Sequence, residues 1–123
     1  MYKAQYLSPM MPSYNIKETA SFFVDILGFT VYMGGGEMQY TILFKDNLSL
    51  HILNAGTDVG EMEFYLSVDD IDGLWDEIKN KLAGIKVRAP FDREYGMREM
   101  HIIVPQTKTL LFIGSPIPPA ATD

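Results

Sequence analysis

One pattern occurs twice in this chain, and it limits the available folds more than any other feature. Residues 15–31 and 70–87 each combine an apolar stripe at helical spacing, a glycine stop and a strand-like segment. A shift of 55 residues aligns the apolar positions in pairs: Ile16 with Ile71, Phe23 with Ile78, and Leu27 with Leu82. Any two amphipathic helices share such a stripe, but matching strands around both favour a duplicated supersecondary unit.

The helix ends follow from the residues that flank each stripe. Asn15 is a good N-cap for the first helix, and Glu18 stands where its side chain can reach back to that cap. Gly28 follows the last apolar position and supplies the left-handed conformation with which helices often end. The second helix is expected over about residues 70–82, with Gly84 as its stop.

Segments rich in β-branched and aromatic residues predict strands on both sides of each helix. In chain order they cover residues 4–10, 29–32, 38–45, 48–53, 62–68, 85–89, 97–104 and 108–113. Pro9 and Pro12 are expected to close the first strand, and Gly34-Gly35-Gly36 to form a turn. Residues 115–123 are expected to form a disordered tail.

The expected fold class is therefore α+β, with two repeated β-α-β-β-β modules whose mixed sheets form a cup. Module one covers about residues 4–54 and module two about residues 62–114, within a single domain of residues 1–123. Each helix must bury its stripe on one face of a four-stranded sheet, which leaves the other face free for a ligand.

The predicted ligand-binding residues lie at alternating strand positions on that free face. They are Met10, Ser49, His51, Leu53, Glu63, Tyr65, Ser67, Arg98, Leu111 and Ile113. Arg98 and Glu99 are neighbours, so a strand places only one of them there. Arg98 would favour an anionic ligand and Glu99 a cationic one; for His101 we expect a structural or surface role.

Composition argues against several classes of partner. Ten Lys and Arg residues oppose sixteen Asp and Glu residues, and a net charge of −6 disfavours nucleic acid. The same charge modestly favours cationic ligands, although it also serves plain solubility. The chain has no cysteine, which fits a cytoplasmic location, and no apolar run approaches the roughly 20 residues of a membrane span.

Two stretches are similar to motifs of the vicinal oxygen chelate superfamily, which includes glyoxalase I, the bleomycin-resistance proteins and the extradiol dioxygenases. Residues 20–29, ASFFVDILGF, resemble the family's helix that ends in Leu-Gly-Phe. Residues 95–105, YGMREMHIIVP, resemble its Gly-x-Arg strand, although residues 104–107, VPQT, replace the usual Asp-Pro-Asp-Gly turn. The resemblance covers residues 4–114, and it implies the fold described above and a homodimer.

The resemblance also suggests where a metal would bind. In metal-dependent members, four side chains from the first and last strands of each module hold one divalent ion. By position these roles fall to Ser8, His51, Glu63 and Leu111. Only His51 and Glu63 carry suitable groups, whereas a catalytic site usually needs about three protein ligands. We therefore expect no cofactor, with a divalent metal as the alternative and Glu63 as the candidate catalytic residue.

The function that the resemblance favours is metal-free binding of a planar or drug-like small molecule, similar to the bleomycin-resistance proteins. Aromatic side chains that offer rings for stacking are Tyr6, Tyr40, Tyr65, Trp75 and Tyr95, with Trp75 expected in the core. One alternative is a metal-dependent lyase or dioxygenase of the same superfamily. Another is a protein that shares only the fold.

Overall fold

The computed structural model describes residues 1–34 and 39–119 of the chain. These form two compact units: the first contains residues 1–62 and 104–109, and the second residues 63–103 and those from 110 onward. Residues 104–109 belong to the first unit because their carbonyls bind its backbone and side chains. The Tyr14 amide donates to Gln106 O, and Thr19 Oγ1 donates to Pro105 O, both at 2.8 Å.

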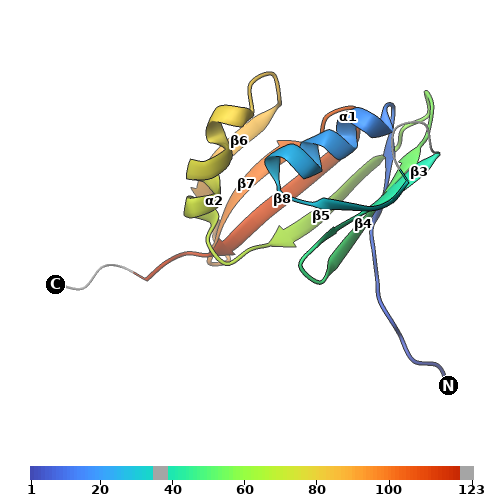
Figure 1. Cartoon of the computed structure of the whole chain (residues 1–123). Helices are drawn as coiled ribbons and strands as arrows, with labels where there is room; N and C mark the ends of the chain where they lie inside the picture. The colour runs from blue at the N-terminus through green and yellow to red at the C-terminus, as the bar shows by residue number, and fades with distance from the viewer. Residues whose placement is uncertain (35–38, 120–123) are drawn as a thin grey trace. The chain divides into compact units, whose positions relative to one another are not determined.

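The two halves of the chain repeat one order of elements. The first half contains β1 (Met10–Ser13), α1 (Ile16–Ser21), the π-helical turn η1 (Phe22–Ile26), β2 (Thr30–Gly34), β3 (Tyr40–Lys45) and β4 (Leu48–Asn54). The second half contains β5 (Glu61–Ser67), α2 (Ile71–Ile78), the 3-10 turn η2 (Lys79–Lys81), β6 (Val87–Asp92), β7 (Met97–Ile103) and β8 (Lys108–Pro116). The sheets have the matching orders β1-β4-β3-β2 and β5-β8-β7-β6 (Figure 1). The α+β fold class and the duplicated β-α-β-β-β module are confirmed.

The first strand differs most from its prediction. It was expected over residues 4–10, but β1 begins at Met10 and continues through Pro12 to Ser13. Proline is tolerated there because β1 lies at the edge of its sheet, where one side of the strand makes no ladder hydrogen bonds. Three predicted positions, Gly35 and Gly36 of the turn and Met38 of the next strand, lie outside the described residues.

The start of α1 carries the predicted cap. Asn15 Oδ1 accepts a hydrogen bond from the Glu18 amide at 3.2 Å, which confirms Asn15 as the N-cap. The Asn15 amide donates to Ser13 Oγ at 2.9 Å. Ser13 therefore supplies the acceptor that was predicted to be the Glu18 side chain. Both glycine stops are confirmed, because Gly28 and Gly84 have φ of +79°.

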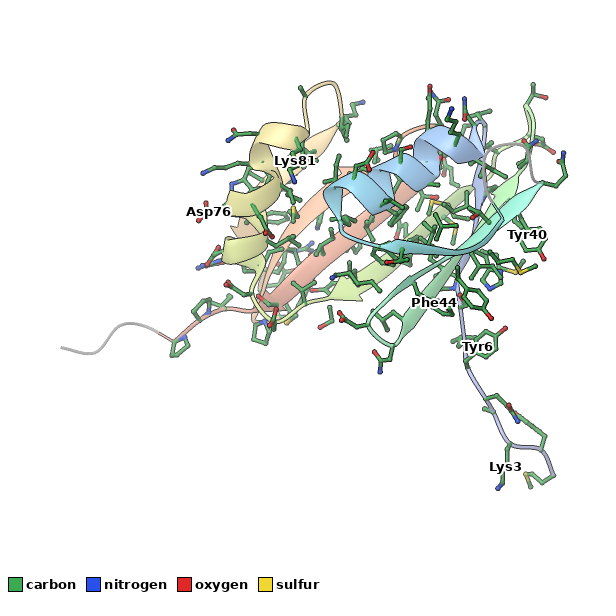
Figure 2. All side chains as sticks on the ribbon, viewed as in Figure 1. Lys3, Tyr6, Tyr40, Phe44, Asp76 and Lys81 are labelled. Atoms are coloured by element: carbon green, nitrogen blue, oxygen red, sulfur yellow. The ribbon has the colours of Figure 1, made fainter. Side chains whose placement is uncertain are left out.

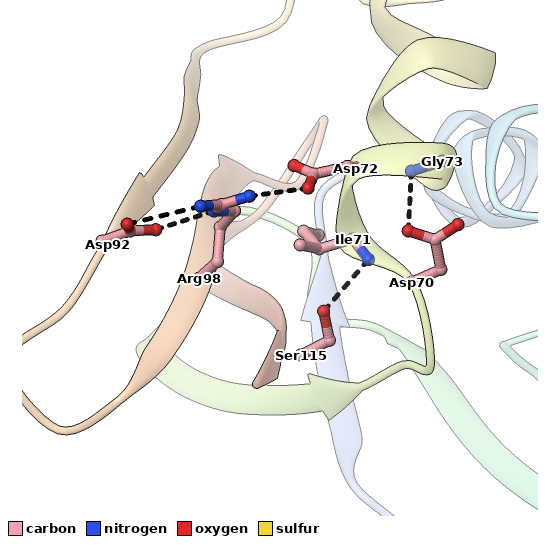
Figure 3. Close-up of polar contacts among 7 residues, drawn as sticks. All are labelled: Asp70, Ile71, Asp72, Gly73, Asp92, Arg98 and Ser115. Carbon is pink, nitrogen blue, oxygen red and sulfur yellow. Dashed lines mark hydrogen bonds and ion pairs between the residues drawn. The ribbon is translucent and has the colours of Figure 1, made fainter. Parts of the chain in front are cut away.

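The prediction of a tail from residue 115 is wrong at its start. Ser115 and Pro116 belong to β8, and Ser115 is buried. Ser115 Oγ accepts a hydrogen bond from the Ile71 amide at 3.1 Å, next to the contact between Asp70 Oδ1 and the Gly73 amide (Figure 3). The end of β8 thereby satisfies an amide that the first turn of α2 leaves without a helical partner.

Each helix covers one face of its own sheet. Helix α1 packs against β3 and β4, and α2 packs against β6 and β7. The buried strand residues of these covered faces include Met11, Leu43, Leu50 and Ile52 in the first sheet, and Met100, Ile102, Leu111 and Ile113 in the second. Strand residues of the opposite parity form what we call the helix-distal face of each sheet.

Candidate functional site

A hollow of about 440 Å³ lies on the helix-distal face of the first unit. Its lining comes from the N-terminal segment, β2, the β3–β4 hairpin and β4: Tyr6, Tyr32, Ile42, Phe44, Asn47, Ser49 and His51. Strand register brings these side chains together, since Ile42 pairs with His51 and Phe44 with Ser49. Figure 2 shows Tyr6 and Phe44 on the side of the hairpin away from α1.

The hollow combines aromatic walls with a few polar groups. The rings of Tyr32 and Phe44 meet edge to face, with centroids 4.7 Å apart. Ser49 Oγ donates to Ser8 Oγ at 2.9 Å, and the His51 amide donates to Pro9 O at 2.9 Å. These two bonds hold the N-terminal segment against β4 beside the hollow. Apolar walls with few polar groups are typical of small-molecule sites.

In the second unit, one buried carboxylate organises the helix-distal face. Glu99 in β7 has 0% of its side chain exposed. Its oxygens accept hydrogen bonds from Tyr95 Oη, from His101 Nε2 at 3.0 Å and from Arg93 Nη1 at 3.4 Å. The Tyr65 hydroxyl contributes a further hydrogen bond. Because these donors satisfy the carboxylate, its burial does not leave an unpaired charge.

This network shifts the pKa of its members in opposite directions. Burial alone raises the pKa of the Glu99 carboxyl, but hydrogen bonds from His101, Tyr95 and Tyr65 outweigh it and leave the pKa lowered. Desolvation of the Tyr65 hydroxyl, which lies against Gly114, and its hydrogen bond to Glu99 raise the pKa of Tyr65 to about 12. The network is therefore stable with Glu99 ionised and Tyr65 neutral.

Rings from all four strands form a row across the same face. Phe91 of β6 meets His101 of β7 with centroids 5.0 Å apart, and His101 meets Phe112 of β8 at 4.4 Å. Phe112 in turn meets Tyr65 of β5 at 6.4 Å. We call Phe91, His101, Phe112 and Tyr65 the aromatic row. It spans the sheet from one edge strand to the other.

Seven of the ten predicted ligand-binding residues have the expected strand parity. Met10, Ser49, His51 and Leu53 lie on the helix-distal face of the first sheet, where Ser49 and His51 line the hollow. Glu63, Tyr65 and Ser67 are the exposed, alternating positions of β5. That these residues bind a ligand stays a prediction.

The parity predicted for Arg98, Leu111 and Ile113 is wrong. Leu111 and Ile113 are fully buried on the covered face, paired with Ile102 and Met100 of β7. Arg98 donates from Nη1 to Asp72 of α2 and from Nε to Asp92, both at 2.7 Å (Figure 3). The hydrogen bond from Arg98 lowers the pKa of the Asp92 carboxyl. Glu99 therefore takes the helix-distal position that was predicted for Arg98.

The residues suggested for a metal do not make a ligand set. Ser8 bonds to Ser49, and Leu111 is a buried hydrocarbon without a donor atom. Among residues 1–34 and 39–119, no three His, Cys, Asp or Glu side chains are grouped so as to hold an ion. Of the four suggested residues, only His51 and Glu63 carry suitable donor groups. A catalytic metal centre usually has about three protein ligands.

Several prominent side chains escaped prediction because alternation within one strand does not show what the next strand contributes. Tyr32, Phe44 and Asn47 line the hollow, and Phe91 and Phe112 complete the aromatic row. Of the rings proposed for stacking, Tyr6 lines the hollow and Tyr65 joins the row. The register of the β7–β8 hairpin, which pairs His101 with Phe112, was a signal from which part of the aromatic row could have been predicted.

In the described residues, no helix has the length and apolar character needed to cross a membrane. No family model and no curated protein matches the sequence.

Solved structures match the fold over nearly the whole chain. The bleomycin-binding protein of the bleomycin producer Streptomyces verticillus, in complex with copper(II)-bleomycin, has 20% identity and a TM-score of 0.76, with 95% of this chain and 100% of that one covered. A bleomycin resistance determinant encoded on the transposon Tn5 has 21% identity and a TM-score of 0.76, with 92% and 98% covered. A glyoxalase-related enzyme from Clostridium phytofermentans has 18% identity and a TM-score of 0.77, with 94% and 98% covered. The predicted likeness to this group of folds is confirmed.

Proposed function

We propose that this chain, which has the fold of the bleomycin-binding and glyoxalase-related proteins, binds a planar small molecule without a metal ion and without transforming it. The observation that carries the proposal is the hollow of about 440 Å³ on the first unit. Its volume lies in the range of about 300–1,000 Å³ that is usual for small-molecule sites. Its exposed rings suit stacking on a flat ligand.

One further observation supports binding over catalysis, and another shows that this fold can hold such a ligand. The described residues offer no grouped metal ligands, so the lyase and dioxygenase alternative has no ion-holding set to build on. Two solved structures of the same fold show a bleomycin-binding protein in complex with bleomycin. Sequestering a toxic planar compound is the role we propose for this chain, which would make it an antibiotic-resistance protein.

The test is a calorimetric screen of planar drug-like compounds of all charge types against the wild type and two variants. Phe44→Ala removes a ring from the hollow, and we expect it to weaken binding about tenfold, the upper range for one aromatic contact. Leu48→Ala is the matched control, because Leu48 is an exposed apolar residue at the other end of the same turn. Absence of binding by every compound would refute the proposal.

We also propose that the protein is a homodimer in the cytoplasm. The N-terminal segment supports the dimer, because Met1, Tyr2, Tyr6 and Leu7 expose large apolar side chains. The cysteine-free sequence supports a reducing compartment.

A further inference from the structure

We infer that the aromatic row of the second unit binds an aromatic carboxylate, with Arg88 as the residue that recognises the acid group. The inference goes beyond the proposed function, since it assigns a second ligand site on the second unit, separate from the hollow of the first unit. It differs from the sequence-based expectation of a cationic ligand.

Arg88 is an accessible cation on this face. It is exposed, lies opposite His101 in the β6–β7 ladder, and holds its guanidinium carbon 3.5 Å from the centroid of the Phe91 ring. No ion pair joins Arg88 to an acid within residues 1–34 and 39–119. A guanidinium that rests on a ring keeps its N–H groups free to form a paired hydrogen bond with a carboxylate.

The neighbouring acids are already engaged. Glu99 is buried and accepts hydrogen bonds from its own side-chain donors, among them the cation Arg93, so it makes no direct contact with a ligand on the surface. Glu94 pairs with Arg93 at 3.6 Å, and Asp92 pairs with Arg98 at 2.7 Å. Arg93 and Arg98 together face four acids, so Arg88 stands out as a cation of β6 that no acid in the described part of the chain pairs with, not through a surplus of positive charge.

Glu61 and Glu63 are exposed acids of the same parity, but both stand on β5, at the opposite edge of the sheet. Three strand spacings, about 14 Å, separate the two edges. Solvent and salt screen a charge at that distance, so neither acid cancels the preference set by Arg88.

The aromatic row supplies the apolar part of the site. The rings of His101 and Phe112 stack on each other with a tilt of 31° and centroids 4.4 Å apart, so they present their edges to a ligand, next to the β6 strand that carries Arg88. From β8 to β6 is about 10 Å, or two strand spacings, which a two-ring aromatic acid spans. Edge-to-face contact with the row and an ion pair with Arg88 can therefore occur together.

Three nearly isosteric probes separate charge from shape: 2-naphthoate, 2-naphthamide and 2-naphthamidine. Calorimetry with the full chain is expected to show naphthoate binding about tenfold more tightly than naphthamide, the effect of one charge-assisted contact. Naphthamidine is expected to bind more weakly than both. Arg88→Gln should abolish the preference for naphthoate, and Arg88→Lys should restore part of it, because lysine keeps the charge but not the planar fork.

Lys81→Gln is the charge-matched control, since it removes one cation from the turn after α2 (Figure 2). It should leave the preference unchanged, and melting curves of all variants should coincide with the wild type because both residues are exposed. Equal binding of naphthoate and naphthamide, or an Arg88→Gln variant that keeps the preference, overturns the inference while planar binding stands. Failure of all three probes also overturns it, and the broader screen with Phe44→Ala then decides the proposed function separately.

Discussion

At Gly114, hydrogen is the only side chain that the surroundings of Glu99 accommodate. An added Cβ would lie 2.9 Å from Glu99 Cγ and from Arg98 O, and it would collide with the Tyr65 hydroxyl. The absence of a side chain at Gly114 is what lets Tyr65 reach the carboxylate across the sheet. One small residue thus sets the geometry of a network built from three strands.

We expect Gly114→Ala to lower the free energy of unfolding by about 1–3 kcal/mol, the usual cost of overpacking. Separation of Tyr65 from Glu99 should also move the pKa of Tyr65 from about 12 back towards 10. Denaturant unfolding and a phenolate absorbance titration measure the two effects. Gly60→Ala is the control, because no atom lies within 4 Å of its added Cβ. Equal stability of both variants would contradict the crowding argument.

The raised pKa of Tyr65 predicts how stability depends on alkaline pH. Because its folded pKa is about 12 against an ordinary 10, its contribution is fully present below pH 10 and is lost as the pH rises towards 12. Tyr65→Phe should make unfolding less sensitive to pH in that window. Tyr2→Phe, which removes an exposed phenol of the N-terminal segment, serves as the comparison. An unchanged slope in Tyr65→Phe would show that the network does not bind the phenol.

At the scale of elements, the two helices begin with the same device but different support. Each has an N-cap residue, Asn15 or Asp70, whose side-chain oxygen accepts a hydrogen bond from the backbone amide three residues later. The cap of α1 is supported by nearby Ser13, whereas α2 depends on Ser115 at the far end of β8. The end of β8 is therefore structural, although its sequence is rich in small residues and proline.

Ser115→Ala removes the acceptor of the Ile71 amide, and we expect it to lower the free energy of unfolding by about 1 kcal/mol. Thermal unfolding measures the loss. Ser67→Ala, at an exposed position of β5, should have a much smaller effect. If both substitutions were neutral, the contact with Ile71 would not stabilise α2.

At the scale of the whole molecule, we expect the N-terminal segment to hold a dimer together. Leu7 exposes its whole side chain, and Leu7→Asp should place a charge in the proposed contact. Sedimentation at micromolar concentration should show a dimer for the wild type and a monomer for Leu7→Asp. Lys3→Ala, in the same segment, should remain dimeric. A monomeric wild type would end the dimer proposal.

Metal addition gives a second whole-molecule prediction. A ligand raises the melting temperature only by binding the native state, and the described residues contain no grouped metal ligands. After treatment with a chelator, added nickel, zinc, manganese or ferrous ion should therefore not raise the melting temperature. His51→Ala is the control for any rise that does occur. A rise that this variant abolishes would revive the metal-dependent alternative.

The sequence by itself determined the duplicated module, the cap of α1 and both glycine stops. These features depend on residues close in the chain, such as Asn15 with Glu18, so periodicity and capping chemistry suffice. Register between strands depends on contacts between distant residues, and a shift of one position reverses every side chain. For that reason only the tertiary structure decided that Glu99 takes the helix-distal side and Arg98 the helix side. The acidic composition likewise suggested a cationic ligand, whereas the tertiary structure places Arg88, an exposed cation, on the Phe91 ring, which supports our inference of an anionic one.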